Sequence, residues 1–259
     1  MPGAISRGFT ERVALVIGGA HDADIVARAV AIQLALEGAY VIVAHEGTDE
    51  TGSSIVESLR ALGTLAHAVG VNRREQDEIA LVFDELDALY GRLDLMVNVA
   101  LVEAQVSLID ATVEEIDACL GASLRSSLLL TQHAARMMRR RGSGGIVNVV
   151  GAEGNANSIA ATIRGGIIGL TKSAAFELAP RIRINGVVIG NTHIGIKSET
   201  GGARAADLAN FAAIFGESAN ATSSDSTIVA ADEAARAVLY LLSPESKFIT
   251  GQILKVGIG

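Results

Sequence analysis

The chain has few cysteines, few prolines and no tryptophan. Its 259 residues include one cysteine and three prolines. A disulfide needs two cysteines, so Cys119 cannot form one within the chain, which fits a reducing compartment. No stretch reaches the roughly 18 consecutive apolar residues of a membrane span, and residues 1–12 contain no apolar signal segment. We therefore expect a cytoplasmic protein.

Basic residues are also scarce. The 21 lysines and arginines are outnumbered by 29 aspartates and glutamates, which gives a net charge of −8. This balance argues against binding to a phosphate backbone, so nucleic acid is not an expected partner. No metal site is expected, because the histidines show no spacing typical of metal ligands; they are His21, His45, His67, His133 and His193.

Short β-branched runs alternate along the chain with longer segments of helical period. Strands are expected at 13–17, 40–44, 65–69, 93–99, 146–150, 182–188 and 252–256. The helices between them are expected at 25–37, 53–62, up to about 90, 113–141 and 159–178. Strands separated by helices imply parallel βαβ crossovers. We predict one α/β domain over residues 1–259, with a doubly wound Rossmann-type parallel seven-stranded sheet and helices on both faces.

The segment from about 191 to 228 interrupts this alternation. It is rich in Gly, Ala, Ser and Thr, with one expected helix at 203–215. We predict a lid over the carboxyl edge of the sheet, where ligands of such sheets bind.

Several segments resemble the short-chain dehydrogenase/reductase family, in the correct order and over nearly the whole chain. They are RVALVIG at 12–18, GRLDLMVN at 91–98, GGIVNV at 144–149, GLTKSAAFELAP at 169–180, IRIN at 182–185 and ITGQIL at 249–254. The resemblance implies a Rossmann-type fold, a nicotinamide cofactor and a catalytic group of Asn, Ser, Tyr and Lys.

The positions of that catalytic group hold other residues. Counted from the shared segments, the Asn, Ser, Tyr and Lys positions are Ser123, Gly151, Ala160 and Arg164. In the family the tyrosine is the general acid and base and the lysine lowers its pKa. Alanine removes the proton donor, and Arg164 is expected to be structural. We therefore predict no catalytic residue and no enzyme activity of the chain by itself.

The cofactor positions have also changed. In the turn that corresponds to the glycine-rich TGxxxGxG motif, the second and third glycine positions fall on Ile25 and Ala27. Asp22 and Asp24 add negative charge where a diphosphate would lie, at a cost on the order of 1 kcal/mol each. We therefore predict no nicotinamide cofactor and no cofactor-binding residues.

The later cofactor positions point the same way. His45 ends the second strand, where the family has an acidic or a basic residue, and Glu46 is expected to be a solvated loop carboxylate. Gly70 replaces the adenine-contacting aspartate, and NVAL at 98–101 replaces NNAG.

The helices and the last strand that form tetramer interfaces in the family are retained. We therefore predict a pseudoenzyme, the non-catalytic subunit of a heterotetramer with an active NAD-dependent short-chain dehydrogenase. It resembles the inactive subunit of heteromeric hydroxyacyl-CoA dehydrogenases such as that of benzylsuccinate β-oxidation.

Two alternatives remain open. One is a cofactor-independent isomerase or cyclase that uses the vacated pocket, with Arg164, His193, Asn191 and Ser123 as its polar groups. The other is a working oxidoreductase with an unusual motif.

Overall fold

The structure is a computed structural model that describes residues 8–18, 22–46, 49–101, 107–151, 157–190 and 225–257. The predicted lid at 191–228 therefore lies outside the described residues as far as residue 224, and so does the helix expected at 203–215. Its last four positions belong to a helix, α8 (Asp225–Leu242).

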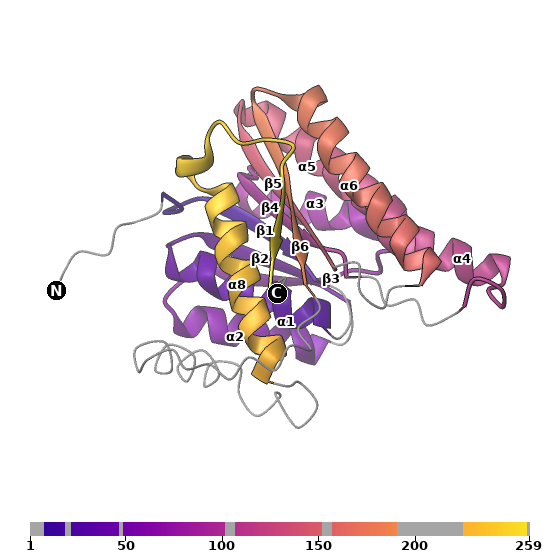
Figure 1. Ribbon diagram of the computed structural model, residues 1–259. Coiled ribbons are helices and arrows are strands. Elements are labelled where there is room, and N and C mark those ends of the chain that lie inside the picture. Colours follow the sequence, from indigo (N-terminus) through magenta and orange to yellow (C-terminus); the bar gives the residue numbers. More distant parts are fainter. Residues whose placement is uncertain are drawn as a thin grey trace.

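Seven parallel strands form one sheet, in the order β3-β2-β1-β4-β5-β6-β7 (Figure 1). They are β1 (Val13–Ile17), β2 (Tyr40–His45), β3 (Ala66–Gly70), β4 (Leu95–Val99), β5 (Gly144–Gly151), β6 (Ile182–Ile189) and β7 (Ile253–Val256). Parallel strands need crossovers, and the intervening helices supply them. The predicted fold class is confirmed.

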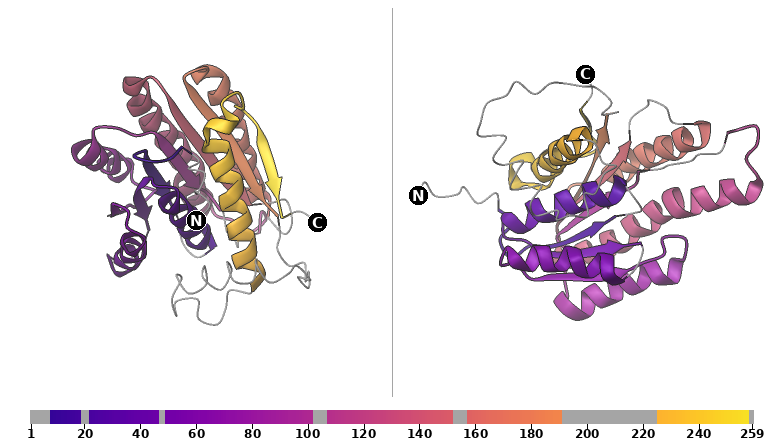
Figure 2. Two further views of the ribbon diagram at one scale, coloured as in Figure 1. Left: turned by 90° about the vertical axis from the view of Figure 1, so that its left-hand side faces the viewer. Right: turned by 90° about the horizontal axis from the view of Figure 1, so that it is seen from below.

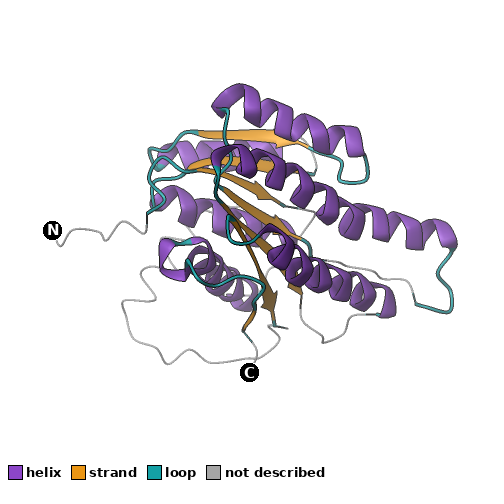
Figure 3. Cartoon of the chain, turned by 90° about the horizontal axis from the view of Figure 1, so that it is seen from above, coloured by secondary structure: helices purple, strands orange, loops and turns teal. Residues whose placement is uncertain are grey.

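Helices cover both faces of the sheet, as Figures 2 and 3 show from three directions. One layer comprises α1 (Asp22–Leu36), α2 (Asp49–Ala61) and α8, whose buried apolar residues form one cluster with the first face. The other layer comprises α3 (Gln76–Tyr90), α5 (Ser126–Arg141) and α6 (Ser158–Leu178). Because both faces are covered, the central strands are nearly continuous runs of buried Val, Ile and Leu.

The helix expected at 113–141 contains a change of geometry. It consists of α4 (Val113–Cys119), a π-helical segment η1 (Leu120–Arg125) and α5. The backbone N–H of Ser126 donates to the carbonyl of Gly121, five residues earlier, and the Ser126 and Ser127 hydroxyls donate to the carbonyls of Ala122 and Ser123. Such side-chain hydrogen bonds compete with the regular helical ladder. A π segment inside an α-helix often marks a functional position.

Strand boundaries differ from the predictions by at most two residues. β5 begins at Gly144 and ends at Gly151, outside the expected 146–150. The β-branched pattern does not reveal these ends, because glycine carries no strand signal. A Cβ on Gly144 would collide with the side chain of Met138 on α5, so glycine permits the close approach of helix and strand.

Candidate functional site

The four positions that correspond to the catalytic group of the family lie on η1, β5 and α6, near the carboxyl edge of the sheet. Ser123 is in η1, and Gly151 is the last residue of β5. Ala160 and Arg164 lie one turn apart at the start of α6. The backbone N–H of Ala160 donates to the Asn157 side chain at 2.9 Å, which caps the helix. Ala160 is 4% exposed, so its methyl group packs into the interior.

Apolar side chains surround these positions. Val150, Ile159 and Ile163 precede Gly151, Ala160 and Arg164 in the chain and belong to one buried cluster. Leu124, which follows Ser123, packs against that cluster, and so does the half-buried Cys119. The structure thus places these segments together around an apolar centre. His193 and Asn191, which the isomerase alternative would also require, lie outside the described residues.

Near this edge, buried polar side chains form a series of hydrogen bonds on the face of the sheet that α5 and α6 cover. The Asn98 amide donates to the Ser127 hydroxyl at 2.9 Å and to the Asn148 side-chain oxygen at 3.1 Å. The Asn148 amide in turn donates to the Thr171 hydroxyl at 3.0 Å. A buried polar group without a hydrogen-bond partner costs free energy. These contacts therefore fix the positions of β4, β5, α5 and α6 relative to one another.

Arg73 ends this polar chain, and sequence reasoning missed it. Its side chain is buried, and its guanidinium donates to the Val99 carbonyl at 3.0 Å, the Asn98 side-chain oxygen at 2.8 Å and the Ser126 hydroxyl at 3.3 Å. Burial lowers the pKa of Arg73, and the charge of Glu46 partly offsets this effect. The available sequence signal was a pair of basic residues beginning three positions after β3. Arginine is seldom buried unless it is paired, so the pattern alone did not indicate a buried side chain.

Next to Arg73, a hollow opens at the ends of β2 and β3. Its volume is about 380 Å³, and it is lined by Glu46, Gly70, Val71, Asn72 and Glu78. The Glu46 carboxylate accepts from the backbone N–H of Arg73 at 3.2 Å, and that of Glu78 from Asn72 at 2.6 Å. Glu46 is a partly exposed residue in the loop after β2, and its carboxylate also holds the loop after β3 in place.

His45 is buried at the end of β2, with 2% of its surface exposed. A Cβ on Gly52 would collide with the His45 ring, so α2 lies directly against it.

In the part of the chain that the structure describes, no group of three or more His, Cys, Asp or Glu side chains could hold a metal ion. No helix within the described ranges has the length and apolarity needed to cross a bilayer.

Comparison with known proteins supplies the family. Residues 19–259 match the family described as enoyl-(acyl carrier protein) reductase. The chain belongs to the short-chain dehydrogenase/reductase family. Staphylococcus aureus has a relative named 3-oxoacyl-acyl-carrier-protein reductase FabG, which is 34% identical over 95% of this chain and 96% of its own length. A Sinomonas cyclohexanicum relative, named cis-4-hydroxycyclohexanecarboxylate dehydrogenase, is 30% identical over 98% of both chains.

Solved structures agree on the short-chain dehydrogenase/reductase fold. A hydroxysteroid dehydrogenase from Escherichia coli superimposes with a TM-score of 0.77 over 98% of both chains, at 22% identity. A short-chain dehydrogenase from Mycobacterium smegmatis gives a TM-score of 0.74 over 96% of this chain and 92% of its own.

These relatives overturn the prediction that the chain is no enzyme by itself. Members at least 30% identical over almost their full length are named as oxidoreductases, which points to an enzyme. The prediction was based on the side chains at four positions and gave less weight to the similarity of the whole chain.

The short-chain dehydrogenase/reductase family implies a nicotinamide dinucleotide, and the described residues at the carboxyl edge do not fit one. Ala27 replaces a family glycine and is packed into the core with 2% of its surface exposed. Asp22 and Asp24 lie in the first turn of α1, the helix end that would otherwise attract a diphosphate. Glu46 and Glu78 add carboxylates to the hollow at the ends of β2 and β3.

Proposed function

We propose that the protein is a subunit of a hetero-oligomeric oxidoreductase of the short-chain dehydrogenase/reductase family. Its partner is a second chain of the same fold, and the complex binds the nicotinamide cofactor. The substrate class is a 3-oxoacyl or 3-hydroxyacyl thioester, as the name of the Staphylococcus aureus relative suggests. The observation that carries the assembly is a set of exposed apolar side chains near β7, the last described strand of the sheet.

That surface joins β7 to the ends of α6 and α8. In the described part of the chain β7 is the last strand of the sheet and pairs with β6 alone, and an edge strand of this kind can pair with another chain. Phe176 on α6 is 91% exposed and Phe248 is 90% exposed. A Cβ on Gly251 would lie 3.5 Å from that of Ala175, which places the loop of Phe248 beside the end of α6. Exposed apolar patches of this kind mark protein interaction sites.

A second apolar surface lies around α4. Leu108, Ile109 and Val113 are 62%, 94% and 68% exposed, and Leu128 on α5 is 50% exposed. Figure 1 shows α4 beyond the sheet, at the opposite side of the molecule from α8. Two separate surfaces on one subunit suit a closed tetramer with two kinds of two-fold interface.

Native mass spectrometry on the protein isolated from its own host through a mild affinity tag tests the assembly. We expect a stoichiometric complex with a second chain of similar mass. The variants Phe176→Glu and Phe248→Glu should release that chain, because a carboxylate in an apolar interface loses its hydration. The matched control is Leu81→Glu on α3, a helix that belongs to neither surface; its side chain is 61% exposed, and the variant should leave the complex intact.

Activity of the isolated complex tests the chemistry. We expect NADH- or NADPH-dependent reduction of a 3-oxoacyl thioester by the complex, followed as loss of cofactor absorbance. A homo-oligomer of this chain that reduces the substrate unaided would overturn the hetero-oligomer and leave the oxidoreductase assignment standing. A complex without redox activity on these thioesters would overturn the substrate class.

A further inference from the structure

A second hollow lies at the amino edge of the sheet, opposite the edge that carries the family's active site. Its volume is about 280 Å³. Its lining includes Arg12, Asp94, Gly144, Arg181, Arg183 and Lys247. These residues come from the starts of four strands and from the segment after α8, so the hollow is a product of the fold as a whole.

Cations dominate this lining. Among the described residues, the lining contains four cations, Arg12, Arg181, Arg183 and Lys247, and one carboxylate, that of Asp94. The charge is noteworthy because the protein as a whole carries a net charge of −8. The last turn of α5, directly before Ser143, adds a further basic run of Arg139, Arg140 and Arg141.

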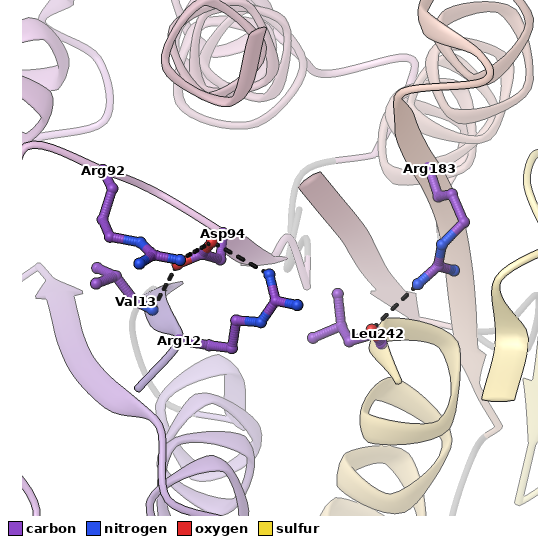
Figure 4. A network of polar contacts seen from close by, with 6 residues as sticks. All are labelled: Arg12, Val13, Arg92, Asp94, Arg183 and Leu242. Carbon is purple, nitrogen blue, oxygen red and sulfur yellow. Dashed lines mark hydrogen bonds and ion pairs between the residues drawn. The ribbon is translucent and has the colours of Figure 1, made fainter. Parts of the chain in front are cut away.

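The Asp94 carboxylate is already neutralised by other partners. Arg92 donates to it from Nε at 2.8 Å and from Nη2 at 2.6 Å, and the backbone N–H of Val13 donates at 2.9 Å. Arg12 makes a longer contact of 3.3 Å through one terminal nitrogen (Figure 4). Two arginines thus share one carboxylate, and the group of three retains a positive charge next to the hollow.

Arg183 forms a rigid wall of the hollow. Its terminal nitrogens donate to the carbonyls of Leu241, Leu242, Ser243 and Ile249, at distances from 2.6 to 3.3 Å. These carbonyls include the last of α8, where a cation is favoured by the helix dipole. In Figure 4 Arg12 lies between Asp94 and Leu242, so it extends from the start of β1 toward the end of α8.

Three cationic side chains remain able to bind a ligand. Arg181 is exposed and makes no side-chain hydrogen bond or ion pair with the described parts of the chain. Lys247 is also exposed, and its ammonium lies 5.0 Å from the centre of the Phe248 ring. Arg12 keeps donors that its one contact with Asp94 does not use.

We propose that this hollow is a binding site for a phosphate-class oxyanion, held by Arg12, Arg181 and Lys247. Arginine pairs with phosphate through two parallel N–H groups, and lysine adds a point charge. Ligand pockets commonly measure about 300–1,000 Å³, so this hollow suits inorganic phosphate or a small phosphomonoester rather than a dinucleotide.

Calorimetric titration of the full chain with sodium phosphate, at constant ionic strength, tests the site. We expect saturable binding of one phosphate per chain. Arg181→Gln should weaken the affinity about tenfold, as removal of one charge-assisted hydrogen bond predicts. Arg12→Gln should weaken the affinity by a similar factor. If Arg12→Gln unfolds the protein, Arg181→Gln still tests the site, because Arg181 is exposed and unpaired in the described chain.

The matched control is Lys172→Gln, which removes one positive charge from an exposed position on α6. Its phosphate affinity should equal that of the unaltered protein.

Binding that does not saturate, or that changes equally in all three variants, would overturn the site. Acetate that competes as well as phosphate would overturn the phosphate class. Glycerol phosphate that binds more tightly than phosphate would support the site and identify an organic phosphomonoester, and the reverse order would support free phosphate. None of these results depends on the partner chain or on redox activity.

Discussion

Asp94→Asn tests how much the negative charge of Asp94 stabilises the amino edge of the sheet. The Asp94 side chain is 3% exposed and accepts hydrogen bonds from Arg92, Arg12 and the backbone of Val13. Asparagine has nearly the same shape, and its oxygen can still accept the Val13 N–H. The substitution therefore removes the ion pairs and spares the backbone contact.

The exposure of the two arginines sets the expected magnitude. Breaking a fully buried ion pair costs about 3–5 kcal/mol, because the remaining charge stays buried without a partner. Here the Arg12 and Arg92 side chains are 43% and 28% exposed, so water can hydrate both once Asp94 is neutral. We therefore expect Asp94→Asn to lower the free energy of unfolding by about 2–3 kcal/mol, between the values for buried and surface pairs.

The pH dependence of this difference is a second test. Burial alone would raise the pKa of Asp94, but hydrogen bonds from Arg92 and Val13 and the charges of Arg92 and Arg12 outweigh it and hold that pKa below its ordinary value. A carboxyl group whose pKa is lowered by folding stabilises the protein above its unfolded pKa, about 3.9 for aspartate. That contribution is lost as the pH falls through the lower, folded pKa. The difference between protein and variant should be constant from neutral pH down to about 4 and should shrink below that.

Urea unfolding followed by circular dichroism, repeated from neutral to acid pH, measures both quantities. The control is Asp87→Asn, which removes an exposed pair with Arg140 whose side chains are 45% and 56% exposed. Surface pairs contribute about 0–1 kcal/mol, so at neutral pH the control should lose less free energy of unfolding than Asp94→Asn. Equal losses in the two variants, or a loss for Asp94→Asn that does not shrink in acid, would refute this account of Asp94.

Three further substitutions test other contacts through the same unfolding measurement. Arg73→Met should cost about 1–3 kcal/mol, because it leaves the buried Asn98 oxygen without a donor; no loss would show that water replaces the guanidinium. Gly144→Ala should cost about 1–3 kcal/mol through its collision with Met138, and Met138→Ala in the same chain should recover part of that loss; purely additive losses would contradict the contact. Arg183→Gln should cost about 1–3 kcal/mol by leaving carbonyls after α8 unpaired, and an unchanged midpoint would argue against that role.

The sequence predicts the sheet well because burial on both faces leaves a clear pattern. All seven strands fall within a few residues of their expected positions. The errors include the ends of β5 at Gly144 and Gly151, the starts of β4 and α2, and η1, where serine hydroxyls alter the helical ladder without changing the apolar period. Patterns of apolar residues contain no information on such hydrogen bonds.

The polar groups near the candidate site were harder to predict. Arg73, Asn98 and Ser126 are far apart in the sequence, and only the crossovers bring them together. Whether Arg73 is buried depends on loops whose direction the sequence pattern does not specify. The prediction of no enzyme activity was wrong because it considered family positions one at a time, whereas relatives share the whole chain.

The hydrogen-bonded polar side chains of β4 and β5 also affect how these strands align with each other during folding. Asn98 on β4 lies directly opposite Asn148 on β5, in strands otherwise made largely of interchangeable Val, Ile and Met side chains. A slip of one residue would turn Asn148 to the opposite face of the sheet. Each amide left without a partner would then cost about 1–3 kcal/mol. The two asparagines therefore discriminate against misaligned sheets that apolar packing alone would tolerate.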